Sequence, residues 1–300
     1  MTQLGINQNA IKFTNITIES DRCVVVREEQ KIAIVNTATR NVTPLNVTVD
    51  SAIMNPSTNV LGLRQKNNLQ IFNLDMRTRM KTTEAADAVL YWRWLDQRTI
   101  AYVTAKAVYH WSMEGDAAPV KKFDIIPEER QVQIIGYDAS ADGNWLFLQG
   151  IAKSAQDNSI EGVLQLYNVP LNRYQPKMNA HGGCFAHLNI NGRDATLFCF
   201  TKKDGNATKL FVVEVGNQDN PLRVQSEINF QQQNDFIVAM VPTSKYGCIY
   251  AISQQGTLFL YDIATGRHIF SRRVSNVCIL RTISLRILMI ICIEWSALRI

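Results

Sequence analysis

The stretch LQIFNL occupies residues 69–74, and a near copy, LFLYDI, occupies residues 258–263. Both begin with an aliphatic residue, continue with residues of alternating size to an aromatic residue, and end with a small polar or acidic residue followed by an aliphatic residue. Four further copies fit this pattern: IAIVNT from Ile32, VYHWSM from Val108, LQLYNV from Leu164 and LFVVEV from Leu210. The six copies start 37 to 56 residues apart, a spacing typical of propeller blades. We therefore expect six blade-like units.

Each copy belongs to a larger unit of strands. A second strand precedes most copies across a polar hairpin, as in VLGL and RQKNN before Leu69 or CIYAIS and QQG before Leu258. A third strand stands further upstream in most units, for example DSAIMNP and QIIGY. Gly, Asn, Asp and Lys at the connections supply the turns that antiparallel hairpins need. The sequence thus predicts an all-β fold of radially arranged antiparallel sheets, the β-propeller class.

The apolar pattern of one copy indicates that both faces of each sheet are buried. In a strand over residues 69–72, Leu69 and Ile71 point to one side while Gln70 and Phe72 point to the other. Apolar bulk therefore stands on both sides of the pleat, whereas a sheet with one face in water alternates more cleanly.

Whole-chain composition favours one large all-β domain. The chain has 300 residues, 46% of them hydrophobic, and its repeats continue to residue 275 without a Pro, Gly or Ser-rich break. We expect residues 1–275 to form one domain. The net charge of +5, from 31 basic and 26 acidic residues, permits an anionic partner but does not call for nucleic acid.

Residues 276–300 depart from the repeat pattern. They contain no hairpin signal, and their longest apolar run, 287–293, is far shorter than the roughly 20 residues that a membrane span requires. We expect a divergent hydrophobic tail here, not a further blade.

Cysteine and histidine usage gives no support for an enzyme, a metal site or a cofactor. The six cysteines include no C-x-x-C pair and several lie inside strand runs, which is typical of reduced, buried thiols in a cytoplasmic protein. The chain start also lacks a signal-peptide pattern. His181 and His187 are spaced unlike metal ligands, and no base is evident for a nucleophile at Cys184. The polar-turn interpretation of the histidines is favoured.

Two short stretches each allow a structural and a functional interpretation. YWRW, residues 91–94, is either core strand, which we favour, or a surface on which bases stack. Arg77, Arg79 and Lys81 alternate, so an extended segment points all three to one side. They are either a solvated edge strand or a cationic rim beside an apolar groove for an extended peptide with an acidic end.

Several strings resemble, in order, the N-terminal domain of the clathrin heavy chain family. They span Leu4 to about Ser275 and include LGINQNAIKFTNITIESD, DSAIMNPSTNVLGL, LQIFNLDMRTRMK, AVYHWSMEG and QNDFIVAM. The resemblance implies a seven-bladed β-propeller of the clathrin terminal-domain type, of which about six blades are recognisable here and the seventh is incomplete. That domain stands at the end of a helical leg, which has no counterpart in these residues.

The resemblance also implies three sites for adaptor peptides. The main groove, between the first two blades, takes a clathrin-box peptide and maps to Leu61, Asn68, Gln70, Phe72, Arg77 and Arg79. Asn68 replaces a Thr, the two arginines replace lysines, and an Arg expected in NVTPLNVT has no counterpart. A top pocket for Trp-containing motifs maps to Phe13, Gln133, Ile135 and Ile151, of which the three apolar residues are alternatively ordinary core. A third groove maps to Trp145, Leu166 and Gln175, with Leu171 replacing an Arg.

The expected function is that of a non-enzymatic coat module that binds adaptor peptides during the formation of clathrin-coated vesicles. The resemblance implies other partners, heavy and light chains, only through the missing leg. It implies that nucleic acid is not a partner and that the domain contacts membranes only through adaptors. It also implies a location on the cytoplasmic face of coated pits and vesicles. The alternative is a truncated propeller scaffold without a coat function; an enzyme on this frame ranks third.

Overall fold

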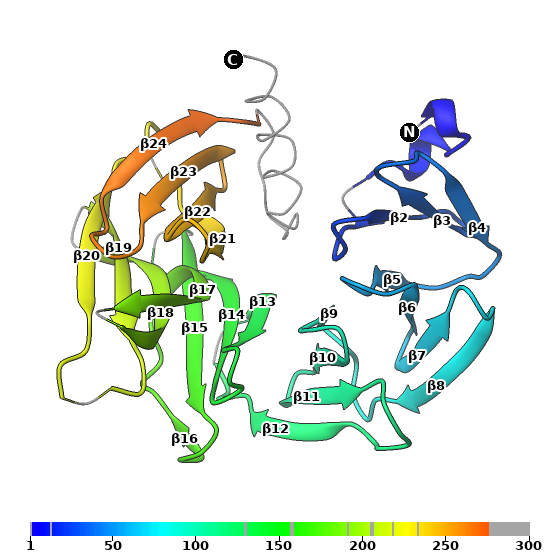
Figure 1. Ribbon diagram of the computed structural model, residues 1–300, viewed down its shortest axis with the longest axis horizontal. Helices are drawn as coiled ribbons and strands as arrows, with labels where there is room; N and C mark the ends of the chain where they lie inside the picture. The colour runs from blue at the N-terminus through cyan, green and yellow to red at the C-terminus, as the bar shows by residue number, and fades with distance from the viewer. Residues whose placement is uncertain are drawn as a thin grey trace. The chain divides into compact units, whose positions relative to one another are not determined.

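The computed structural model describes residues 2–275, except residues 13, 129–130, 157–158, 191, 205–206, 218 and 233. Within them the chain forms six four-stranded antiparallel sheets and two short 3₁₀ helices, η1 (Thr2–Leu4) and η2 (Gln8–Ala10). Strands adjacent in the sequence are adjacent in every sheet, so each sheet is an up-and-down meander of the kind that makes a propeller blade (Figure 1). The predicted all-β fold class and its six blades are confirmed. The tail predicted over 276–300 lies outside the described residues.

The described residues divide at Pro127 and Glu128 into two compact units of three sheets each. In the first unit, sheet 1 contains β1 (Ile16–Thr17), β2 (Cys23–Arg27), β3 (Ile32–Asn36) and β4 (Val42–Leu45). Sheet 2 contains β5 (Ser51–Met54), β6 (Val60–Gln65), β7 (Asn68–Asn73) and β8 (Thr78–Glu84). Sheet 3 contains β9 (Tyr91–Trp94), β10 (Thr99–Val103), β11 (Ala107–Ser112) and β12 (Val120–Asp124).

The second unit repeats this arrangement with longer strands. Sheet 4 contains β13 (Gln133–Ala139), β14 (Trp145–Lys153), β15 (Ile160–Asn168) and β16 (Arg173–Tyr174). Sheet 5 contains β17 (Ala180–Ile190), β18 (Arg193–Asp204), β19 (Ala207–Glu214) and β20 (Arg223–Ile228). Sheet 6 contains β21 (Ile237–Thr243), β22 (Cys248–Ser253), β23 (Thr257–Asp262) and β24 (His268–Arg273).

The six-residue repeat forms the third strand of every sheet. LQIFNL overlaps β7 and LFLYDI overlaps β23, and the upstream strings form the first and second strands as predicted. Each sheet also has a fourth, outer strand that the repeat pattern did not reveal. All six residues of β24 are exposed. Five of the seven residues of β8 are exposed and the other two are half-buried. Such strands lack the apolar alternation by which strands are recognised in a sequence.

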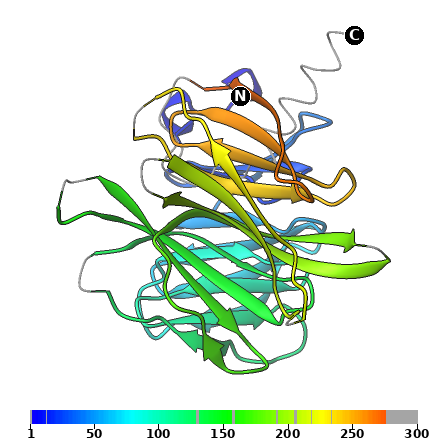
Figure 2. The same ribbon diagram turned by 90° about the vertical axis from the view of Figure 1, so that its left-hand side faces the viewer.

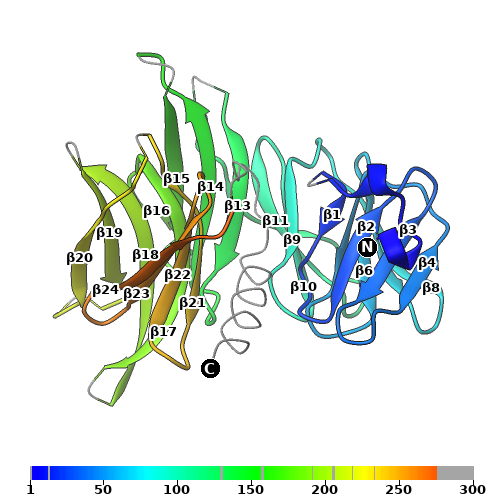
Figure 3. The same cartoon turned by 90° about the horizontal axis from the view of Figure 1, so that it is seen from above.

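Sheet 2 lies between sheets 1 and 3 in the first unit, which Figure 3 shows from above, and it packs through both of its faces (Figure 1). On one face Leu61 and the half-buried Phe72 join apolar residues of sheet 1, among them Ile34. On the other face Leu69 and Ile71 join the two buried tryptophans of β9, which confirms that YWRW belongs to the core. The prediction that Gln70 and Phe72 face away from Leu69 and Ile71 follows from the same packing and is confirmed.

Sheet 5 has the corresponding central place in the second unit (Figure 2). One of its faces packs on sheet 4 through residues such as Phe147 and Phe198, and the other packs on sheet 6. Gly162 of β15 allows the close approach of sheets 4 and 5, because a Cβ atom there would stand 1.9 Å from the carbonyl oxygen of Ala180. A side chain at this position would therefore push the two sheets apart.

Candidate functional site

The predicted main groove corresponds to one row of residues across sheet 2. Strand pairing aligns Met54 with Leu61, Leu61 with Phe72, and Phe72 with Arg79. Residues paired directly in an antiparallel sheet project from the same face, so the row lies on the face that packs against sheet 1. We call Gln70, Phe72 and Arg79 the sheet-2 edge surface. Leu61, at the inner end of the row, is fully buried and therefore not accessible to a ligand.

Burial falls steadily along this row from the inner to the outer strand. Met54 and Leu61 are fully buried, Phe72 is half-buried, and Arg79 is exposed. Gln70 lies on the same face, paired with the buried Leu63, and its side-chain amide makes no hydrogen bond within the described part of the chain. The edge therefore offers an aromatic ring and a free amide beside a cation.

Asn68 is the first residue of β7, and Arg77 directly precedes β8. Asn68 is exposed and has the same strand parity as Gln70 and Phe72, so it shares their face. Arg77 is exposed in the β7–β8 hairpin with a φ of 52°, and Asn73 supports this turn by accepting a hydrogen bond from the Met76 N–H at 2.9 Å. The left-handed backbone at Arg77 means that it is not part of an extended strand.

The expectation that Arg77, Arg79 and Lys81 all point to one side is wrong. The register of β7 and β8 shifts, so that Ile71 pairs with Lys81 while its neighbour Phe72 pairs with Arg79. Met80 is the extra residue of this β-bulge, which places Arg79 and Lys81 on opposite faces. Only Arg79 of these two accompanies Phe72.

Lys81 is engaged on the opposite face, within the first unit. Its Nζ donates hydrogen bonds of 2.9 Å to the carbonyl oxygens of Ser112 and Ala117, and it lies 5.8 Å from the centre of the Trp111 ring. By contrast, neither Arg77 nor Arg79 forms an ion pair with any described residue. Sequence parity could not separate these roles, because the bulge depends on pairing with β7.

Three of the four predicted top-pocket residues lie on adjacent strands of sheet 4. Gln133, which is exposed, pairs directly with Ile151, and Ile135 is the extra residue at a register shift in β13. Ile135 and Ile151 are 6% and 8% exposed, so the structure leaves only small parts of them accessible. Phe13, the fourth residue, lies outside the described residues.

The predicted third groove maps to the contact between sheets 4 and 5. Trp145 and Leu166 both belong to the apolar cluster that joins these sheets, with Leu166 buried and Trp145 half-buried. The Gln175 N–H donates a 2.9 Å hydrogen bond to the Leu166 carbonyl oxygen, which places Gln175 beside Leu166. Leu171, which replaces the family arginine, is 67% exposed.

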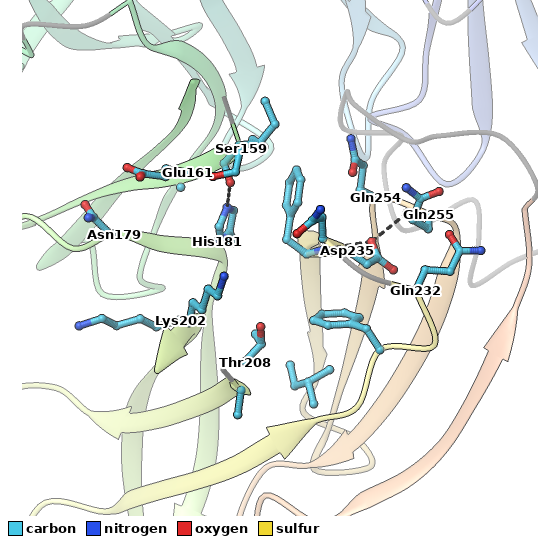
Figure 4. A pocket seen from close by; sticks show the side chains of 18 of the residues that line it. Ser159, Glu161, Asn179, His181, Lys202, Thr208, Gln232, Asp235, Gln254 and Gln255 are labelled. Atoms are coloured by element: carbon cyan, nitrogen blue, oxygen red, sulfur yellow. Dashed lines mark hydrogen bonds between the residues drawn. The ribbon is translucent and has the colours of Figure 1, made fainter. Parts of the chain in front are cut away.

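A polar cavity in the second unit was not predicted from the sequence. Its volume is about 1190 Å³, and it is bounded by β15, β17, β18 and β19 on one side and by the β20–β21 connection with the β22–β23 hairpin on the other. Figure 4 shows His181 and Lys202 on the first wall and Gln232 and Gln255 on the second. The only signal was the amide-rich run NFQQQND at residues 229–235.

The histidine in this cavity is held in its neutral form. Burial lowers the pKa of His181 to about 4, although its hydrogen bond to the Ile160 carbonyl oxygen at 3.3 Å acts in the opposite direction. Its ring lies 4.6 Å from that of Phe236. Within the described residues no group of His, Cys, Asp and Glu could hold a metal ion. Searched over the same residues, the chain has no helix long and apolar enough to cross a membrane.

Sequence comparison finds similarity to clathrin heavy chains. The chain is 39% identical over 290 residues to the probable clathrin heavy chain 1 of Caenorhabditis elegans, and 38% identical over 288 residues to the human clathrin heavy chain 2. The probable clathrin heavy chain of Schizosaccharomyces pombe is 30% identical over 294 residues. These matches cover 91% to 94% of this chain but only 17% of each relative's length. No protein-family model matches the chain.

Structural comparison supports the fold alone. A chain of the mitotic checkpoint complex matches with a TM-score of 0.59 and 13% identity, covering 87% of this chain and 78% of its own length. KlHsv2 with its loop 6CD replaced by a Gly-Ser linker matches with a TM-score of 0.57, also at 13% identity, covering 87% of this chain and 81% of its own length.

Proposed function

We propose that this chain, a homologue of the clathrin heavy chains, is a non-enzymatic module of a vesicle coat that docks short adaptor peptides on the sheet-2 edge surface. The row from Leu61 through Phe72 to Arg79 is the observation that carries the proposal. An extended peptide with alternating aliphatic residues can place them against Phe72 and its acidic end against Arg79.

The remaining contacts of the edge surface suit the same ligand. The Gln70 amide can both donate to and accept from a peptide backbone, and Arg77 adds a second exposed cation at the hairpin. A short peptide loses much freedom on binding and buries little area, so each site is expected to be weak and to act through many copies in a lattice. Adaptors with clathrin-box or Trp-containing motifs are the proposed partners, at the cytoplasmic face of coated pits.

The test is the affinity of a fluorescent peptide with alternating leucines and an acidic end, measured by anisotropy. Phe72→Ala should weaken binding by about 1 to 3 kcal/mol, the range for truncating an aromatic anchor. Phe270, an apolar ring that is 39% exposed on β24, provides the matched control, and Phe270→Ala should leave the affinity unchanged. Equal affinity of a folded Phe72→Ala variant and the wild type would refute the docking site.

The alternative function, a propeller scaffold without a coat role, predicts no preference between this peptide and a scrambled one. The homology favours the coat module, because the similarity extends over more than nine tenths of the chain.

A further inference from the structure

We propose that the cavity of the second unit is a separate docking site for an extended, polar and acidic peptide segment. We call it the amide cavity, because eight of its lining residues are Asn or Gln: Gln156, Asn179, Asn229, Gln231, Gln232, Asn234, Gln254 and Gln255. The inference rests on the proposed peptide-docking function and extends it to a site that neither the repeats nor the family resemblance indicated.

The size of the amide cavity favours a chain segment over a small molecule. Pockets for small ligands usually enclose roughly 300 to 1,000 Å³, and this cavity measures about 1190 Å³. It is bounded by strands and connections from three consecutive sheets, so a ligand that fills it must reach across all three. An extended peptide has the required length.

The amides favour a ligand that alternates hydrogen-bond donors and acceptors. Each Asn or Gln side chain offers a carbonyl oxygen and an N–H₂ group, which match the C=O and N–H groups of an extended backbone. Amides stand on both walls, with Asn179 on one and Gln232 and Gln255 on the other (Figure 4). None of the eight side-chain amides hydrogen-bonds to another described residue, so all of them are available to a ligand.

The charges of the amide cavity favour an acidic ligand. Lys202 and Lys203 are exposed at its wall and form no ion pair with a described residue. The neighbouring acid, Asp204, is engaged by Lys209 at 2.8 Å. The buried Asp235 instead accepts hydrogen bonds from the main-chain N–H groups of Phe236 and Gln255 through one oxygen. Glu161 of β15 also lines the cavity, where it is half-buried, so Lys202 and Lys203 are the exposed charges among the described lining residues. These two ammonium groups are therefore the charged contacts offered to carboxylates of a ligand.

Aromatic rings form part of the lining of the amide cavity. The ring of His181 lies against that of Phe236, and Phe230 belongs to the lining as a half-buried ring. Since His181 is neutral, the positive charge of the site comes from the two lysines.

The experiment selects a phage-displayed library of random peptides on the full chain and sequences the enriched peptides. The cavity variant Lys202→Gln with Lys203→Gln removes two exposed charges. The matched control, Arg223→Gln with Lys245→Gln, removes two exposed charges elsewhere in the same unit. We expect a class of acidic, polar peptides whose affinity falls about tenfold in the cavity variant and stays unchanged in the control and in Phe72→Ala.

The outcomes separate this inference from the proposed function. If every enriched peptide loses affinity in Phe72→Ala and none in the cavity variant, the edge surface binds peptides and the amide cavity does not. If acidic peptides weaken equally in the cavity variant and in the charge control, they respond to net charge alone and the inference is overturned. A cavity-dependent class with no class dependent on Phe72 would support the amide cavity and contradict the edge surface.

Discussion

Replacing Arg79 or Lys81 by Gln should have opposite consequences, although the two residues are only two positions apart. Both changes remove one positive charge from β8. The β-bulge at Met80 places Arg79 beside Phe72 and directs Lys81 towards sheet 3. Arg79→Gln should therefore weaken peptide binding with little change in stability, and Lys81→Gln should reduce stability with little change in binding.

The magnitudes follow from the surroundings of each charge. Two exposed charges about 4 Å apart in water interact by about 1 kcal/mol, so Arg79→Gln should weaken binding of an acidic-ended peptide about fivefold at low salt. That difference should shrink towards zero near 1 M salt, where the Debye length is about 3 Å. Lys81→Gln removes two charged hydrogen bonds to carbonyl oxygens and a contact with Trp111, and should lower the free energy of unfolding by about 1 to 3 kcal/mol.

The assays are peptide anisotropy over a salt series and denaturant unfolding of both variants. A control peptide has Asn in place of its terminal acidic residue and an amidated C-terminus, so its end carries no negative charge. This peptide should bind the wild type and Arg79→Gln with the same affinity. The reasoning would be refuted if Lys81→Gln flattened the salt dependence as much as Arg79→Gln did. It would also fail if Arg79→Gln bound the acidic peptide with wild-type affinity at low salt.

Three further changes test the packing and the buried groups. Gly162→Ala should lower the free energy of unfolding by about 3 kcal/mol, since its Cβ would overlap a backbone carbonyl oxygen of sheet 5. Gly136→Ala is the control, because its Cβ would meet its nearest neighbour at 3.4 Å. In the same denaturation assay it should lower the free energy of unfolding clearly less. Burial lowers the pKa values of His110 and His181 to about 4 in the folded protein, from the usual 6.5. Between these two pH values the unfolded chain therefore binds more protons than the folded chain. The free energy of unfolding should therefore fall by about 2 kcal/mol for each histidine as the pH drops from about 7.5 to 5. If a His181→Gln variant lost as much stability over this pH range as the wild type, the prediction for His181 would be wrong. Trp94→Phe should lower the free energy of unfolding by about 1 to 3 kcal/mol, because the buried indole N–H donates a hydrogen bond to a main-chain carbonyl oxygen of β5. An unchanged midpoint in thermal or chemical unfolding would show that this hydrogen bond contributes nothing to stability.

The sequence alone was sufficient to predict the inner strands of most sheets and the face on which Gln70 and Phe72 lie. Alternation and hairpin turns are local features, so they located the first three strands of most sheets, and residue parity placed Gln70 and Phe72 opposite Leu69 and Ile71. The outer strands were missed because solvent-facing strands such as β24 carry no apolar period. They form because the third strand of each sheet offers unpaired backbone groups.

Tertiary structure decided what the charged and polar residues do. Parity predicted one basic side for Arg77, Arg79 and Lys81, but pairing with β7 introduced the bulge that separates the last two. The amide cavity likewise combines residues from 154 to 255, whose approach depends on the packing of sheets 4 to 6 and on the missing side chain at Gly162. Strand identity is encoded within a few residues, whereas the face that a polar side chain reaches and the residues it meets depend on contacts between segments far apart in the chain.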